Sequence, residues 1–315
     1  MNNSFDEVLN VIQSNNTFLL IAHKKPDGDA IGSAIALGKG LKALNKKVDY
    51  YIDPNMENKI KIFDEIECFN QNLQSNYDLV IFLDCSTKDY AYFPSSGLEE
   101  TLTLVIDHHR SNTGFCDMNY VIESAATGEL IFDILKALQV TIDSEIADAL
   151  YTSISTDTGS FQFSNVTTNT HRVLSELYKI KKSYAVLAKK LHEEKTLEQI
   201  KILGHAINSL QLLCDGQIAW INIAYEDIIA NGGGTNIGDE VSNLGVNIPS
   251  VKLSATLKEL EKGVFKVSLR SKSPHDIDVS TFAKSRGGGG HMRAAGFTFT
   301  GDPMQLQKEL IEFLQ

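Results

Sequence analysis

The segment "IAHKKPDGDAIGS" (residues 21–33) decides the fold, because it joins a strand pattern to a helix pattern. The apolar run "TFLLIA" (17–22) leads into it. A short, continuous apolar run is typical of a strand that is buried on both faces of a parallel sheet. The connecting loop brings His23, Asp27 and Asp29 together at the end of this strand. The segment therefore predicts a strand, a functional loop and a helix, in that order.

Two further apolar runs, "DLVIFLD" (78–84) and "TLVID" (103–107), have the same character. Helical patterns over about residues 30–44, 125–138 and 144–154 separate or follow the three runs. Alternation of strands and helices indicates a sheet of mostly parallel strands with helices packed on it. We therefore expect an N-terminal, doubly wound α/β domain.

The second half of the chain has a different organisation. The pattern is helical from Thr170 to about Leu213, and beyond Gly216 strand-like runs alternate with short helices. This predicts a smaller C-terminal α+β domain. We place the N-terminal domain at 1–187, a helical connector at 188–213 and the C-terminal domain at 214–315, with the active site in the cleft between the two domains.

Composition indicates a soluble globular protein. Hydrophobic residues make up 43% of the 315 residues and charged residues 22%, which is ordinary for that class. The N-terminus lacks a basic leader, and no apolar run approaches the roughly 20 residues of a membrane span, so we expect a cytoplasmic protein without a membrane partner. The four cysteines are scattered without CxxC spacing, which suggests neither a disulfide framework nor a structural zinc site.

The net charge of −11 argues against binding to duplex DNA, because a long phosphate footprint needs a broad basic surface. Basic residues nevertheless gather near the end of the chain, against only Asp276 and Asp278: Lys266, Arg270, Lys272, Lys284, Arg286 and Arg293. Such a cluster is either a site for a small anionic substrate or a solvated basic face, and charge alone does not decide between them.

Each of the three predicted strands ends in side chains that bind metals. The side chains that follow them are His23, Asp27, Asp29, Asp84, Asp107, His108 and His109, and Asp157 comes on the loop after a later helix. The carboxyl ends of parallel strands meet at one edge of the sheet, where ligands bind. One carboxylate after a strand is usually a helix cap or a turn residue. Several at one edge predict a shared site.

The mixture of ligands indicates the metal and the chemistry. Carboxylates with a minority of imidazoles and no thiolate suit Mn²⁺, with Mg²⁺ as the alternative. These candidate ligands are too many for one ion that must also admit water and substrate, so we expect two divalent ions. A pair of ions activates one water molecule and binds a phosphoryl oxygen. The expected reaction is hydrolysis of a phosphoester.

Four segments carry a family resemblance. "HKKPDGDAIGS", "LVIFLDCS", "VIDHHRSN" and "SISTDTGSF" resemble, in order, the four motifs of the DHH phosphoesterases. The end of the chain, "DVSTFAKSRGGGGHMRAAG", resembles the DHH-associated C-terminal domain with its GGGGH sequence. The resemblance covers nearly the whole chain, and it implies a DHH catalytic domain followed by a substrate-binding domain.

The resemblance also implies roles for individual residues. The two metal sites would share Asp84 as a bridging ligand. The ligands would be His23, Asp27 and Asp84 for the first ion, and Asp29, Asp84, His108 and Asp157 for the second. His109 would face the substrate as a proton or hydrogen-bond donor. Asp107 would orient the histidines.

Substrate-binding residues are expected in both domains. Glycines without side chains let backbone N–H groups approach an anion, so Gly288, Gly289, Gly290 and His291 are predicted to bind phosphate or carboxylate. Arg270 could bind a phosphate or stack on a base. Arg110, Ser111 and Asn112, directly after the double histidine, are expected to line the site. Arg286 stands where many relatives have an apolar residue, and a cation there would favour an extra terminal phosphate.

Size and the missing membrane segment indicate, by resemblance, the compact oligoribonuclease group often called nanoRNases. That group implies hydrolysis of short single-stranded RNA and linear dinucleotides such as pApA to mononucleotides, together with a phosphatase activity on 3′-phosphoadenosine 5′-phosphate. A soluble cyclic-dinucleotide phosphodiesterase, an inorganic pyrophosphatase and a nucleotide sensor stay open as alternatives. Relatives of this build are often homodimers, so a homodimer is an option.

Overall fold

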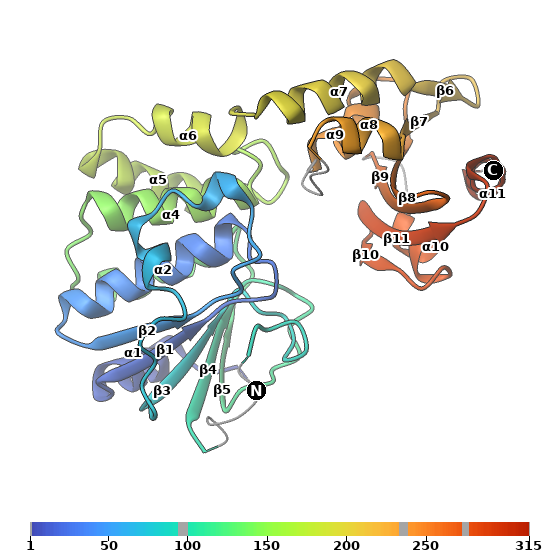
Figure 1. The fold of residues 1–315 in the computed structure, drawn as a ribbon. Coiled ribbons are helices and arrows are strands. Elements are labelled where there is room, and N and C mark those ends of the chain that lie inside the picture. The colour runs from blue at the N-terminus through green and yellow to red at the C-terminus, as the bar shows by residue number, and fades with distance from the viewer. Residues whose placement is uncertain (1, 94–99, 233–238, 273–276, 315) are drawn as a thin grey trace. The chain divides into compact units, whose positions relative to one another are not determined.

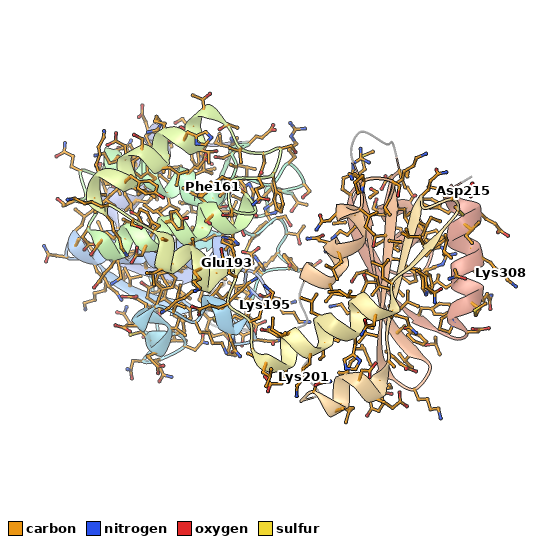
Figure 2. All side chains as sticks on the ribbon, turned by 90° about the horizontal axis from the view of Figure 1, so that it is seen from above. Phe161, Glu193, Lys195, Lys201, Asp215 and Lys308 are labelled. Carbon is orange, nitrogen blue, oxygen red and sulfur yellow. The ribbon has the colours of Figure 1, made fainter. Side chains whose placement is uncertain are left out.

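The computed structural model describes residues 2–93, 100–232, 239–272 and 277–314. The chain divides into two compact units, residues 1–194 and 195–315 (Figure 1). Figure 2 labels Glu193 and Lys195, which stand on either side of this division. Within the described ranges, no helix combines the length and the apolar character that a membrane crossing requires. The division at 187 and 213 and the shared cleft stay predictions.

A five-stranded parallel sheet forms the centre of the first unit. Its strands are β1 (Thr17–Ile21), β2 (Lys47–Tyr51), β3 (Leu79–Leu83), β4 (Leu102–Asp107) and β5 (Met118–Val121). They lie in the order β2-β1-β3-β4-β5, so β3 is in the middle with β1 and β4 beside it. The predicted mostly parallel α/β domain is confirmed.

Helices pack on one face of this sheet. They are α1 (Phe5–Ser14), α2 (Gly28–Ala43), α3 (Thr127–Ala137), α4 (Ser144–Asp157), α5 (Thr168–Ile180) and α6 (Ala185–His192). Figure 1 shows α2 next to the sheet and α4 on the far side of α2. Alternate strand residues such as Leu20 and Ile81 point into this core. The opposite face, with Leu19 and Val80, is covered by the segments that follow β3 and β4, through Phe93 and Phe115.

Two short 3₁₀-helices, Asn58–Ile60 and Asp64–Cys68, connect β2 to β3.

Two glycines let α2 and α4 approach closely. A Cβ atom at Gly28 would lie 2.4 Å from Thr156 Oγ1, and one at Gly32 would lie 2.4 Å from the carbonyl oxygen of Ala149. Because α2 begins beside Asp27 and α4 ends at Asp157, this close packing brings metal-binding side chains from both helices to the same end of the sheet.

The second unit contains a six-stranded mixed sheet in the order β10-β11-β9-β8-β7-β6. Its strands are β6 (Gln211–Leu213), β7 (Ile218–Ile223), β8 (Leu253–Glu261), β9 (Val264–Ser271), β10 (Gly289–His291) and β11 (Ala294–Thr300). Its helices are α7 (Leu197–Ser209), α8 (Tyr225–Ala230), α9 (Asp239–Leu244), α10 (Val279–Lys284), α11 (Pro303–Leu314) and the 3₁₀-helix Gly245–Asn247. Trp220, Leu257 and Phe297 pack in its core. The predicted α+β domain is confirmed.

Candidate metal centre

The candidate ligands meet at the carboxyl ends of three adjacent strands. The chain leaves β1 toward β2 on one side, whereas β3 lies on the other side, so the strand order reverses at β1. Ligands bind at such switch points because the loops there diverge and leave a crevice. Asp84 directly follows the central strand β3, which places it between the side chains that follow β1 and β4.

One group of ligands surrounds His23. Its Nε2 atom lies 3.8 Å from Asp27 Oδ1 and 3.6 Å from Asp84 Oδ2. His23 and Asp84 are buried, while more than half of the Asp27 side chain is exposed, at 58%. These three atoms lie close enough together to hold one metal ion. The open side at Asp27 would give water or substrate access to that ion.

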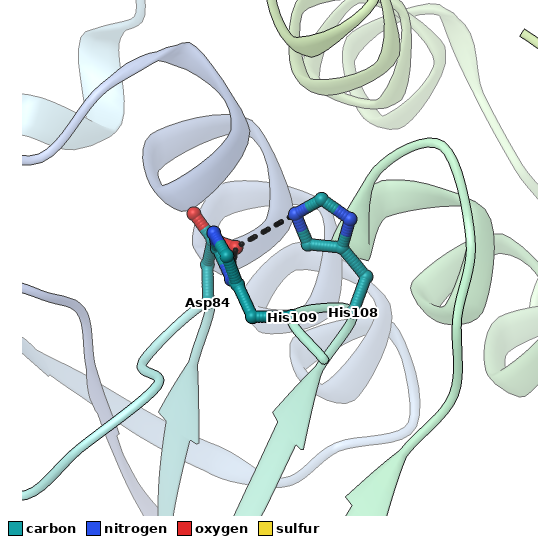
Figure 3. Close-up of side chains that lie close together, drawn as sticks. All are labelled: Asp84, His108 and His109. Carbon is teal, nitrogen blue, oxygen red and sulfur yellow. Dashed lines mark ion pairs between the residues drawn. The ribbon is translucent and has the colours of Figure 1, made fainter. Parts of the chain in front are cut away.

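A second group surrounds His108. Its Nε2 atom lies 3.5 Å from Asp84 Oδ1, 3.5 Å from Asp157 Oδ2 and 3.7 Å from Asp29 Oδ2. Figure 3 shows the carboxylate of Asp84 pointing toward His108, with the dashed line between them. The two oxygens of Asp84 thus face different histidines. This geometry allows Asp84 to bridge two ions.

The second nitrogen of each histidine fixes its tautomer. His23 Nδ1 lies 2.9 Å from the carbonyl oxygen of Lys24, and His108 Nδ1 lies 3.0 Å from that of Ser124. A carbonyl oxygen only accepts, so Nδ1 carries a proton in both rings, which leaves Nε2 as the nitrogen that can bind a metal ion once it is deprotonated. His108 Nε2 is buried and has no hydrogen-bond partner among the described residues. A buried polar atom without a partner, facing three carboxylates, fits a metal ligand.

The electrostatics of the site also favour a cation. Burial raises the pKa of Asp29 well above its ordinary value, and repulsion from Asp84 and Asp157 adds to this rise. Burial raises the pKa of Asp157 to about 7, with Asp84 adding to the effect and His108 opposing it. Burial disfavours the charged form of His23, but Asp27 and Asp84 outweigh it and raise its pKa to about 11. Divalent cations would relieve the repulsion among these carboxylates.

The backbone at Asp84 is held in an uncommon conformation. Its φ angle is +56°, in the left-handed region that Asp and Asn tolerate better than other side chains with a Cβ. Its N–H donates to the carbonyl oxygen of Ile106 on β4, at 3.1 Å. Such conformations cluster at functional sites. The turn directs the carboxylate back over the end of the sheet.

The carboxyl group of Asp29 caps a helix that begins about a hundred residues further along the chain. The N–H groups of Thr127 and Gly128, at the start of α3, donate to its two carboxylate oxygens at 2.7 and 3.2 Å. The hydroxyls of Ser33 and Ser153 also donate to Asp29. The position 126 before α3 is an alanine, which provides no side-chain cap of its own. Asp29 is therefore fixed from three helices.

His109 forms a different interaction from His108. Its Nδ1 lies 2.8 Å from Asp107 Oδ1, and Asp107 is fully buried. Asn112 Nδ2 donates to the other oxygen of Asp107 at 2.6 Å. Burial alone would lower the pKa of His109, but the hydrogen bond that it donates to Asp107 and the charge of Asp84 raise this pKa to about 9. His109 is accordingly charged at neutral pH and remains partly exposed.

Arg110, Ser111 and Asn112 were expected to line the site next to the double histidine, and their contacts in the structure differ from one another. Arg110 forms an ion pair with Glu123, and both side chains are largely exposed. Asn112 donates to Asp107 and to the carbonyl oxygen of Cys85, so its amide joins the segment after β4 to the segment after β3. Ser111 lies between them in the same turn. The roles of these three residues in substrate binding stay predictions.

In the second unit, part of the glycine run is already hydrogen-bonded. The N–H of Gly288 donates to the carbonyl oxygen of Ala283 and ends α10, whereas Gly289, Gly290 and His291 form the edge strand β10. Arg270 on β9 donates from Nε to Asn243 Oδ1 at 3.2 Å. The anion site expected here would therefore use the edge of β10 rather than a free loop.

Arg286 does not have the free cationic group that the sequence suggested. Its guanidinium lies 3.5 Å from the centre of the Phe282 ring and forms an ion pair of 2.6 Å with Glu309 on α11. It also donates to the carbonyl oxygen of Phe282. Because Glu309 pairs with the charge and the Phe282 ring covers one face of the guanidinium, Arg286 links α11 to α10. The extra phosphate contact expected of Arg286 stays a prediction.

Several site residues were not identified from the sequence. Thr127 donates from Oγ1 to Asp84 Oδ1 at 3.0 Å, and Ser33 and Ser153 donate to Asp29. Tyr90 stacks on His23. The small residues of "SAATGEL" (124–130), at the start of an otherwise apolar helix, were the available sign of a polar helix terminus.

Comparison with known proteins identifies the family that the chain resembles. Residues 17–154 match the model of the DHH family, N-terminal domain. The chain is 30% identical over 301 residues to the bifunctional oligoribonuclease and PAP phosphatase NrnA of Thermus thermophilus, covering 94% of this chain and 87% of that protein. It is 25% identical over 300 residues to the protein of the same name from Bacillus subtilis, covering 92% and 91%.

Solved structures share the fold. An exopolyphosphatase-related protein from Bacteroides fragilis superimposes with a TM-score of 0.88 at 22% identity, over 98% of this chain and 94% of that one. The exonuclease RecJ bound to manganese gives a TM-score of 0.51 at 12% identity, over 99% and 94%. At these identities the likeness concerns the fold alone. Together with the family model, the full-length relatives and the four motifs at one sheet edge, it shows that the chain belongs to the DHH family.

Proposed function

We propose that this protein hydrolyses the phosphodiester bonds of short oligoribonucleotides and linear dinucleotides such as pApA to mononucleotides. Removal of the 3′-phosphate from 3′-phosphoadenosine 5′-phosphate is the proposed second activity. The observation that carries the proposal is the buried Nε2 atom of His108, which faces Asp29, Asp84 and Asp157. The substrate class is supported by the relatives named bifunctional oligoribonuclease and PAP phosphatase.

Two divalent ions are the proposed cofactors. His23, Asp27 and Asp84 would hold one ion, and Asp29, Asp84, His108 and Asp157 the other. When bound, a pair of such ions supplies a nucleophilic water at neutral pH and neutralises charge on the phosphoryl oxygens. Two imidazoles among carboxylates favour Mn²⁺ over Mg²⁺, because Mg²⁺ prefers oxygen ligands and keeps several waters.

His109 is the proposed proton donor. Asp107 accepts from Nδ1 and thereby orients the ring, which leaves Nε2 for the substrate. A charged imidazole can donate a hydrogen bond to a phosphoryl oxygen or a proton to the departing ribose oxygen. Asn112 holds Asp107 in turn, so the three side chains form one relay of hydrogen bonds. In the second unit, we assign the binding of a further substrate phosphate to Arg270 and the edge of β10, with His291.

The first experiment is chromatography of the products formed from pApA and Mn²⁺. We expect conversion to AMP by the intact protein, abolished by EDTA and by Asp84→Asn. A Tyr178→Ala protein serves as the matched control, since Tyr178 is an exposed residue of α5 outside the site. Survival of pApA under these conditions would overturn the proposal.

Other phosphate compounds test the alternatives. A cyclic dinucleotide that is hydrolysed faster than pApA would make the protein a cyclic-dinucleotide phosphodiesterase. Release of orthophosphate from pyrophosphate, but not from 3′-phosphoadenosine 5′-phosphate, would indicate a pyrophosphatase, and tight nucleotide binding without turnover a sensor. Cytoplasmic location, a homodimer and the lack of duplex DNA binding stay predictions.

A further inference from the structure

A tyrosine outside the ligand set lies directly against the metal centre. The ring of Tyr90 stacks on the imidazole of His23, with ring centroids 4.9 Å apart and planes inclined by 10°. Tyr90 nevertheless keeps 48% of its surface exposed. Since His23 covers one face of the ring, a ligand can stack only on the opposite face. A half-exposed aromatic ring beside a phosphate-binding centre presents a flat apolar surface at the position where a nucleotide must approach.

The backbone holds Tyr90 in this position. The N–H of Lys24 donates to the carbonyl oxygen of Tyr90 at 2.8 Å, and the N–H of Tyr92 donates to that of Ala22 at 2.9 Å. These bonds frame an antiparallel bridge between His23 and Ala91. Ala91 is buried in the core on the second face of the sheet. Tyr90 is therefore rigidly placed before any ligand binds, which lowers the entropy cost of binding.

A second pair of rings extends the aromatic surface. Tyr92 stacks on Tyr51, the last residue of β2, with centroids 5.0 Å apart and planes inclined by 18°. His23 follows β1, and Tyr51 ends the neighbouring strand β2, so the two ring pairs lie at adjacent strand ends. Aromatic side chains thus follow one another across the carboxyl ends of β1 and β2.

We infer that the outer face of Tyr90 binds a nucleobase of the substrate by stacking. The inference rests on the proposed function, because it specifies how that site recognises a nucleotide. Aromatic side chains stack on every base, since each base has a π-face, so the contact selects for a nucleotide without selecting its sequence. The base, Tyr90 and His23 would form one continuous stack that ends at the candidate metal centre.

The competing role for Tyr90 is mechanical. A ring packed on His23 could hold the imidazole in place without touching the substrate. The two roles differ in what they affect: a stacking residue contributes to binding of ligands that carry a base, whereas a support for His23 affects metal binding and every substrate alike. A ligand with and without a base therefore separates them.

The test measures binding of AMP and of ribose 5-phosphate to the intact, Mn²⁺-loaded protein by calorimetry. We expect Tyr90→Ala to weaken AMP binding roughly 5- to 150-fold, the range that stacking on one base represents, and to leave ribose 5-phosphate and Mn²⁺ binding unchanged. Tyr90→Phe, which keeps the ring, should bind AMP like the wild type. Tyr178→Ala is the matched control for loss of an exposed tyrosine.

Two results would overturn the inference. Equal weakening of AMP, ribose 5-phosphate and Mn²⁺ by Tyr90→Ala would make Tyr90 a support for His23, and unchanged AMP binding would remove it from the site. Tyr90→Leu, which keeps most of the side-chain volume, gives the same test if the alanine protein folds poorly. A protein that binds AMP through Tyr90 but leaves pApA intact would refute the proposed reaction and keep this inference.

Discussion

Thr127 Oγ1 donates a hydrogen bond of 3.0 Å to Asp84 Oδ1, the carboxylate oxygen that also lies 3.5 Å from His108 Nε2. The N–H of the same threonine donates to Asp29 Oδ2 at 2.7 Å. One residue at the start of α3 therefore fixes two carboxylates from different segments: Asp29 in the first turn of α2 and Asp84 directly after β3. Both contacts are buried.

Replacing Thr127 by Val should lower activity about 10- to 100-fold, the usual effect of removing a group that orients metal ligands. Valine keeps the shape and the N–H but removes the hydroxyl, so Asp84 loses a donor while Asp29 keeps one. The rate of pApA hydrolysis at saturating Mn²⁺ provides the measurement. Thr127→Ser should restore it, and full activity in the valine protein would show that the hydroxyl has no role.

Asp84→Asn should reduce the rate about a thousandfold, because several kcal/mol of charge stabilisation depend on the ions that this carboxylate would share. Asparagine tolerates the positive φ angle at this position, so the fold should persist. Thermal unfolding of both proteins checks this, and calorimetry should show weaker binding of Mn²⁺. Two ions bound with unchanged affinity would exclude a bridging role.

Substitutions of the two adjacent histidines should have different effects on metal binding and on catalysis. His108→Gln should weaken Mn²⁺ binding, since Nε2 points among three carboxylates. His109→Gln should leave Mn²⁺ binding largely intact and lower kcat by about 10²- to 10⁴-fold, the range for loss of a general acid. Calorimetry and steady-state rates on both proteins test this. The reverse pattern would exchange the roles of the two residues.

Binding of Mn²⁺ should strengthen as the pH rises from 6 to 9 and should release protons. The carboxylates of Asp27 and Asp84 overcome the effect of burial and raise the pKa of His23 to about 11, so this imidazole is charged throughout that range. A ligating imidazole must be neutral, so the ion displaces the proton, and lower proton concentration favours the ion. Calorimetry in buffers of different ionisation enthalpy measures the release, and zero release would contradict ligation by His23.

In the second unit, Lys258 should make stability rise between about pH 8 and pH 10.5. Burial lowers its pKa from 10.5 to about 8, and Lys266 opposite it on β9 adds to the effect. The unfolded chain therefore binds a proton in that range that the folded chain does not, so the free energy of unfolding increases with pH until both states are neutral.

Urea unfolding of the wild type and of Lys258→Met at several pH values tests this. The methionine protein should be more stable below pH 8, and its advantage should shrink toward pH 10.5. A difference that stays constant across this range would show that Lys258 does not titrate there.

The sequence was sufficient to predict those strands whose hydrophobic pattern is unambiguous. Strands β1, β3 and β4 are buried on both faces, so they appear as continuous apolar runs, and the residues after them are brought together by parallel pairing. Strand β2 was not predicted, because Asp49 interrupts its apolar residues and its burial alternates. The three-residue strands β6 and β10 are too short to show a period.

The support around the ligands depends on contacts distant in sequence. Ser153 donates to Asp29 across 124 positions, and Thr127 donates to Asp29 across 98. Neither residue differs in kind from the many serines and threonines of ordinary helices. Arg286 shows the opposite problem, because its charge suggested a ligand site while a partner on α11, Glu309, already neutralises it.

The close approach of α2 and α4 limits how the chain can vary in evolution. A side chain at Gly32 would meet backbone atoms of α4, the carbonyl oxygen of Ala149 and the N–H nitrogen of Ser153, so no substitution of a neighbouring side chain can make room for it. Gly204 on α7 has no atom within 4 Å of such a Cβ. Saturation mutagenesis with selection for activity should therefore recover only glycine at position 32 and a broad range of residues at position 204.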